Sequence, residues 1–192
     1  MPLGIWLKAG VSATALVLAM AGAATAATAP AGESSTAQAA TVTLRYDDSR
    51  AAGWEAAIAA GVASWNANVS NVRLVEAAPG TAAEIVIVAT TGWPQATLGP
   101  VRPGRQVRVE LGSQAVNQGY NKTRIAAHEL GHSLGLPDTK PGPCSQLMSG
   151  SSAGTACTNA TPNTTERSRV QSAYASATAA LAPTDRILID AP

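Results

Sequence analysis

The chain has no phenylalanine, and among its 192 residues it has only two histidines and two cysteines. Because aromatic residues make up only 4% of the chain, a core has to be built from Val, Ile, Leu and Ala together with Trp. The formal net charge is +1, which gives no electrostatic case for a nucleic-acid partner. The length is sufficient for one domain with a substantial core.

Both histidines fall in residues 128–138, which read His-Glu-Leu-Gly-His-Ser-Leu-Gly-Leu-Pro-Asp. On a helix, His128 and His132 lie one turn apart on one face, so both imidazoles can hold one metal ion. Glu129 is then expected at the rim, placed to take a proton from a metal-bound water. Gly135 can adopt left-handed backbone angles and end the helix, which lets Asp138 return toward the metal.

Since no third histidine exists, a catalytic zinc site with three protein ligands needs a carboxylate or a thiolate. Asp138 is the nearest candidate for that ligand. The alternative is an ordinary surface helix. An apolar stripe lies away from the polar motif residues, which argues against core histidines; it consists of Ala126, Ala127, Leu130 and Leu134.

The N-terminus is predicted to be a secretory signal peptide over residues 1–26. A charged start precedes a mostly apolar run over residues 9–20, which is too short for a comfortable membrane span. Residues 27–40 are rich in Ala, Ser, Thr, Gly and Pro and are expected to be a short pro-segment or linker. We therefore expect an exported, extracellular protein without membrane attachment after cleavage, the alternative being a membrane anchor.

Four segments are predicted to be strands: Thr41–Tyr46, Val72–Glu76, Glu84–Ala89 and Gln106–Leu111. The third contains an Ile-Val-Ile-Val run, as expected for a strand covered on both faces. Residues 47–49 offer caps for a following helix. The predicted core face of that helix consists of Trp54, Ile58, Val62, Trp65 and Val69.

Residues 95–102 form a weaker candidate strand that contains Pro100, which is tolerated on sheet edges. An open edge there could hold an extended peptide by strand addition, although a plain surface loop is an equal alternative. Asn163 and Glu166 resemble a capping box that opens a helix extending to about Leu181. Val170, Tyr174 and Leu181 are expected to face the sheet or the motif helix, and residues 182–192 to form a tail.

The two cysteines, Cys144 and Cys157, both follow the motif. In an oxidising compartment we expect them to form one disulfide. The alternative makes one of them a zinc ligand.

At Asp138 the sequence resembles the snapalysins, small secreted neutral zinc metalloproteases of bacteria that belong to the metzincins. The resemblance covers roughly residues 41–175 and is most specific in its second half. The matching stretches are Thr41-Val42-Thr43, Leu147-Met148-Ser149-Gly150, Gly142-Pro143-Cys144, Cys157-Thr158-Asn159 and Glu166-Arg167-Ser168-Arg169-Val170.

The resemblance implies one catalytic zinc ion held by His128, His132 and Asp138, with Glu129 as general base. It also implies that Met148 forms the Met-turn beneath the metal ligands, and that cleavage is favoured just before aromatic residues. A family calcium site would fall on Asn121 and Thr123; because Asn121 replaces a carboxylate, calcium binding is doubtful. Asn121 or Thr123 can instead cap the motif helix.

We therefore expect an α/β (α+β) fold of metzincin type, with a twisted, mostly parallel sheet, an active-site helix and a C-terminal helix over residues 41–181. The expected function is that of a secreted, monomeric zinc endopeptidase acting on proteins or peptides. One alternative is a secreted, non-catalytic zinc-binding module of protease ancestry, against which the presence of Glu129 argues, since a structural site needs no base. Another is a protein attached to the membrane or cell wall.

Overall fold

The structure, a computed structural model, describes residues 40–175 and 185–191. The predicted signal peptide and nearly all of the predicted linker therefore lie outside the described residues. Within the described ranges, no helix has the length and apolar character needed to cross a membrane.

Six strands form one sheet in the order β2-β1-β3-β5-β4-β6. Their bounds are β1 Val42–Arg50, β2 Val72–Glu76, β3 Ile85–Thr90, β4 Gln95–Thr97, β5 Val107–Gly112 and β6 Ile187–Ile189. Strands β2, β1, β3 and β5 run parallel, whereas β4 is antiparallel to both β5 and β6. The predicted mostly parallel α/β architecture is confirmed, and the run Ile85–Val88 in the interior strand β3 is buried as expected.

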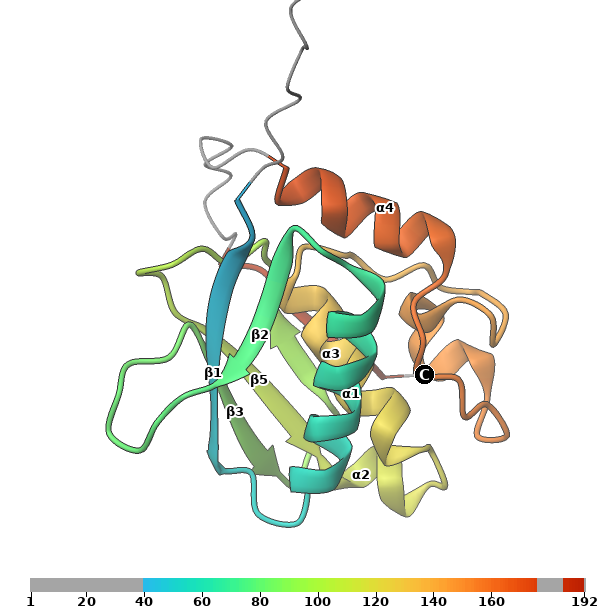
Figure 1. The fold of residues 1–192 in the computed structure, drawn as a ribbon. Helices are drawn as coiled ribbons and strands as arrows, with labels where there is room; N and C mark the ends of the chain where they lie inside the picture. The colour runs from blue at the N-terminus through green and yellow to red at the C-terminus, as the bar shows by residue number, and fades with distance from the viewer. Residues whose placement is uncertain (1–39, 176–184, 192) are drawn as a thin grey trace, which may run out of the picture. The chain divides into compact units, whose positions relative to one another are not determined.

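The helical segments are α1 Glu55–Asn68, α2 Ser113–Asn117, α3 Lys122–Ser133, the 3-10 segment η1 Leu147–Ala153, and α4 Thr164–Ala173. Helices α1 and α3 lie side by side against the sheet (Figure 1). Their backbones approach closely, because a Cβ added to Gly61 would lie 3.0 Å from the Ala127 nitrogen. The indole N–H of Trp65 donates to the Ala127 carbonyl at 2.8 Å, so a buried hydrogen bond joins α1 to α3.

The start of α1 differs from the prediction. Residues 47–49 were expected to cap the helix, but β1 continues through Arg50, which pairs with Val88 of β3 after an irregularity in the register. The helix therefore begins only at Glu55, after Trp54, and no side chain in the described part of the protein caps it. Its predicted core face is confirmed, since all five of its residues are at most 8% exposed.

The C-terminal helix α4 has the predicted capping box between Asn163 and Glu166. It ends at Ala173 and does not reach the predicted end near Leu181, which lies outside the described residues. Val170 and Tyr174 are buried as expected. The Tyr174 hydroxyl donates to the Val101 carbonyl at 2.9 Å. This bond anchors the tyrosine side chain in the core at the point where the chain leaves α4.

The edge formed by β4 is not open, contrary to one of the two predictions for residues 95–102. Only Gln95–Thr97 is a strand, and Pro100 lies beyond it. The outer side of β4 pairs with β6, which comes from the stretch expected to be a tail. The reason is that residues 187–189 can pair through their backbone with the otherwise unsatisfied edge.

Candidate metal centre

Helix α3 is fixed at both ends. The Asn121 side chain caps its start by accepting the N–H of Arg124 at 2.9 Å. At its end, Gly135 has φ +101°, a left-handed conformation that favours glycine, and its N–H donates to the His132 carbonyl at 2.9 Å. A Cβ at Gly135 would also press against Pro100. The turn predicted at Gly135 is therefore present, and it redirects the chain toward Asp138.

Each imidazole of the motif is oriented by a backbone carbonyl. Nδ1 of His128 lies 3.0 Å from the Leu147 oxygen, and Nδ1 of His132 lies 2.7 Å from the Leu136 oxygen. Because a carbonyl can only accept, each Nδ1 carries a proton, and Nε2 is the nitrogen of each ring that can give its lone pair to a metal ion. Both Nε2 atoms are buried and have no hydrogen-bond partner among the described residues.

Asp138 completes this cluster. Its Oδ1 lies 3.3 Å from Nε2 of His128 and 3.5 Å from Nε2 of His132. The three potential ligand atoms all lie within 4.8 Å of one another. Two imidazole nitrogens and a carboxylate oxygen that converge without other partners fit a divalent cation, and this donor set suits zinc.

The electrostatics of the cluster also favour a cation. Burial disfavours a charged His128, but the adjacent Asp138 carboxylate and the charges of Asp190 and Glu129 outweigh it and raise the pKa of His128 to about 9. Burial and the neighbouring positive His128 lower the pKa of His132. The surrounding carboxylates thus hold one positive charge in the metal-free chain, and a bound cation can replace that proton.

Glu129 was expected at the rim, but its side chain is fully buried. Every residue of α3 from Arg124 to Ser133 is buried, because α3 packs against α1, β4, β5 and η1 and its polar face meets protein as well. Neither carboxylate oxygen of Glu129 has a hydrogen-bond partner in the described ranges. Burial raises the pKa of this carboxyl well above its ordinary value.

Met148 is buried in η1 beneath α3. A Cβ on Gly131, which stands between the two histidines in the sequence, would lie 2.7 Å from the Met148 sulfur. The Met148 carbonyl accepts the N–H of Thr139 at 2.8 Å, and its own N–H donates to Glu166 at 2.8 Å. Met148 thereby connects the segment after Asp138 to the start of α4.

The loop that carries Met148 is closed by the predicted disulfide. Cys144 and Cys157 are bonded, with their Cα atoms 5.5 Å apart. Both sulfurs are thus engaged, which excludes the alternative of a thiolate ligand. The buried guanidinium of Arg124 ties the same loop to α3 by donating to the carbonyls of Asn159 and Gln146 at 2.7 and 3.0 Å.

The positions proposed for calcium lie at the start of α3. The Asn121 side-chain oxygen is already used there by the helix cap, and Thr123 is half-buried in the first turn. Calcium binding at these two residues stays a doubtful prediction.

Sequence reasoning missed Asp190 and its partner Lys140. Asp190 Oδ1 lies 3.9 Å from Nε2 of His128 and 2.6 Å from the Lys140 ammonium group. With His128 and Glu129, Asp190 forms a second group of potential ligand atoms within 4.8 Å of one another. The only available signal was the short apolar run Ile187-Leu188-Ile189 just before an acidic residue, which is consistent with a strand but too short to be specific.

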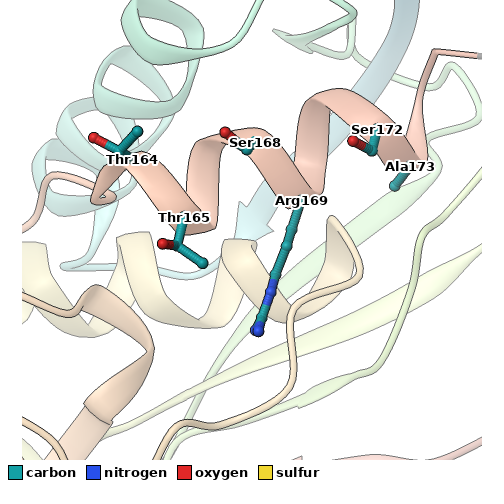
Figure 2. Close-up of a pocket in the computed structure, with 6 residues that line it drawn as sticks. All are labelled: Thr164, Thr165, Ser168, Arg169, Ser172 and Ala173. Atoms are coloured by element: carbon teal, nitrogen blue, oxygen red, sulfur yellow. The ribbon is translucent and has the colours of Figure 1, made fainter.

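An open pocket of about 590 Å³ lies along α4 (Figure 2). Its lining consists of Thr164, Thr165, Ser168, Arg169, Ser172 and Ala173. The lining contains none of the predicted site residues and no buried polar side chain, so this pocket offers no support for a second reactive site.

Residues 41–177 match the Streptomyces extracellular neutral proteinase (M7) family. The chain belongs to this family. It is 44% identical over 134 residues to the extracellular small neutral protease of Streptomyces coelicolor, a match that covers 70% of this chain and 60% of that relative. It is 42% identical over 135 residues to the protein of the same name from Streptomyces caespitosus, covering 70% of this chain and 98% of that relative.

The chain thus spans about 60% of the length of several curated relatives of this family. A solved structure with local similarity is high choriolytic enzyme 1, a hatching enzyme zinc-protease from the medaka fish Oryzias latipes. That similarity has a TM-score of 0.38 and 26% sequence identity, and covers 51% of this chain and 46% of the other.

Proposed function

We propose that the protein is a secreted zinc endopeptidase that hydrolyses peptide bonds in proteins, with zinc held by His128, His132 and Asp138. The observation that carries the proposal is the convergence of two unpartnered imidazole nitrogens on one carboxylate oxygen, within a family of neutral proteinases. The disulfide supports an extracellular location, because structural disulfides persist in oxidising compartments.

A zinc ion bound by these ligands supplies a Lewis acid that polarises the scissile carbonyl and makes water more acidic. The chain contributes the proton transfers. Glu129 is buried, has no competing hydrogen bond from the described residues, and has a raised pKa. A carboxylate in that state can accept a proton from the attacking water and return it to the leaving amine.

Three groups hold the site in position for this chemistry. The carbonyls of Leu147 and Leu136 fix the two imidazoles, and Met148 supports α3 from below. We further propose that cleavage is favoured before aromatic residues, as in the snapalysins, and that the enzyme acts as a monomer on protein or peptide substrates without nucleic acid or membrane partners.

The test is Glu129→Gln, which preserves size and removes the basic carboxylate. The variant is expected to keep one equivalent of zinc and to lose kcat by roughly 10²–10⁴-fold on casein, since that is the usual contribution of a general base. Glu76→Gln, at an exposed position of β2, is the matched control and should behave as wild type. Loss of zinc would make Glu129 a ligand, and near-wild-type turnover of zinc-loaded variant would contradict the mechanism.

A further inference from the structure

The segment that contains β6 pairs with every residue of β4. Gln95, Ala96 and Thr97 pair with Ile189, Leu188 and Ile187. The ladder extends at both ends, because the Leu98 N–H donates to the Arg186 carbonyl at 2.8 Å and the Asp190 N–H donates to the Pro94 carbonyl at 2.9 Å. The chain therefore occupies the β4 edge as an added strand, from Arg186 to Asp190.

This segment lies outside the part of the chain that the family accounts for. The family match ends at residue 177, before β6 begins. The Streptomyces caespitosus relative is covered to 98% by a match that takes up only 70% of this chain. The β4–β6 pairing is thus a feature that the family match does not explain.

The segment is held mainly by its backbone and by one charged residue. Ile187 and Ile189 are 57% and 55% exposed, and only Leu188 of β6 is buried. A strand held through main-chain hydrogen bonds, with few side-chain pockets, is how an extended peptide binds to a sheet edge.

Asp190 is the charged anchor. It is only 5% exposed, and its Oδ1 accepts the Ser151 N–H at 3.0 Å and pairs with Lys140 at 2.6 Å. Gly150 leaves room for it, because a Cβ there would overlap the Asp190 carboxylate. The next carbonyl, that of Ala191, accepts from Lys140 at 2.8 Å and from the Ser151 hydroxyl at 3.0 Å.

This anchored carboxylate faces the metal centre. Its Oδ1 lies 3.9 Å from Nε2 of His128. Asp190, His128 and Glu129 offer potential ligand atoms that all lie within 4.8 Å of one another. Carboxylate oxygens are ordinary zinc ligands, and a catalytic zinc site needs its fourth position open. A carboxylate of the chain itself that reached that position would compete with water and substrate.

We propose that residues 186–191 are an intramolecular, substrate-like inhibitor, in which β6 fills the β4 edge and the Asp190 carboxylate closes the metal site beside His128 and Glu129. The proposal rests on the proposed function, since it assumes that β4 and the metal site are where substrate is bound and cleaved. A tethered segment has an effective concentration on the order of mM, so a weakly binding sequence is sufficient to inhibit.

The first experiment compares Asp190→Ala with Asp185→Ala in the full zinc-loaded chain. Asp185 is exposed and immediately precedes the segment, outside the ladder. Asp190→Ala is expected to raise kcat/KM for a peptide substrate by ~10-fold or more, because it removes a contact that tethering makes intramolecular. Asp185→Ala is expected to leave kcat/KM unchanged. Leu188→Ser, which loosens β6 without touching the metal-facing groups, should raise kcat/KM by a smaller factor.

The second experiment adds the segment back as a separate peptide. The heptapeptide Arg-Ile-Leu-Ile-Asp-Ala-Pro, with the sequence of residues 186–192, is expected to inhibit Asp190→Ala competitively. The same peptide with Ala in place of Asp should inhibit much more weakly. Failure of the first peptide to inhibit better than the second would contradict the role of the carboxylate.

The third experiment does not depend on hydrolysis. With Co²⁺ in place of zinc, Asp190→Ala is expected to change the visible absorption spectrum relative to wild type and Asp185→Ala, and the heptapeptide to restore it. If no variant hydrolyses peptides but the spectrum responds in this way, the proposed function fails and the closure by Asp190 stands. If Asp190→Ala only lowers thermal stability and matches Asp185→Ala in both kcat/KM and spectrum, the segment is structural and the inhibitor proposal is wrong.

Discussion

The buried carboxylate of Glu166 joins two parts of the molecule by accepting the Met148 N–H at 2.8 Å through one oxygen and the Asn163 N–H at 2.7 Å through the other. The same residue thus closes the capping box of α4 and fixes the loop beneath the proposed metal ligands. The Leu147 carbonyl, which orients His128, immediately precedes Met148. The start of α4 is therefore connected through Met148 and Leu147 to the orientation of His128, a proposed metal ligand.

Glu166→Ala should consequently cost more than the loss of a helix cap. We expect the free energy of unfolding to fall by about 2–4 kcal/mol, combining the cap with an unsatisfied buried N–H. Asn163→Ala, which removes the cap alone, should cost about 1 kcal/mol. Urea denaturation measures both. Equal losses in the two variants would show that the bond to Met148 contributes little.

Asp138→Ala tests the third ligand. Because removal of even an outer-shell partner lowers metal affinity by ~10–100-fold, loss of a direct ligand should lower zinc affinity by more than ~100-fold. The fold should survive, since Asp138 is partly exposed and lies outside the core. Competition with a chelator gives the affinity, with Asp185→Ala as the control; wild-type affinity in Asp138→Ala would remove this residue from the ligand set.

Gly131→Ala tests the close packing of Met148 against α3. A Cβ there would lie 2.7 Å from the Met148 sulfur and 3.0 Å from Cζ2 of Trp65. We expect a loss of about 1–3 kcal/mol, as is usual for overpacking a well-filled core, despite the better helix propensity of Ala. Gly92→Ala is the matched control, since no described atom lies within 4 Å of its added Cβ. Thermal unfolding of the two variants decides the point.

The disulfide contributes stability by restricting the unfolded chain. Cys144 and Cys157 are 13 residues apart, and closing a loop of that size is worth roughly 3 kcal/mol in the chain-entropy model. The double variant with Ser at both positions should be destabilised by about that amount. Intact-mass measurement with and without alkylation tests the bond itself: uptake of two alkyl groups without reductant would mean free thiols in the secreted protein.

Local patterns predicted most of the sheet and the active-site helix. The Ile-Val-Ile-Val run of β3, the core face of α1 and the capping box of α4 each depend on neighbours in sequence, so periodicity and composition were sufficient. The geometry of residues 128–138 followed from helical spacing and one glycine. These features needed no knowledge of distant contacts.

The remaining features depend on pairings between distant segments. The burial of Glu129 results from packing on every side of α3, which a helical wheel does not contain. β1 runs past residues 47–49 because β3 lies beside it. β6 and the approach of Asp190 to His128 depend on a segment that pairs with β4, which lies 90 or more residues earlier in the chain. A three-residue strand gives too weak a periodic signal to predict its partner.

The hydrogen bond from Trp65 to Ala127 has a practical consequence. The indole is fully buried and is bonded to the residue that immediately precedes His128 in the chain. Tryptophan emission depends on the polarity and hydrogen bonding around the indole. The protein therefore carries an intrinsic fluorophore against the helix that holds the proposed zinc ligands, and we expect its emission to report binding and release of the ion in solution without a label.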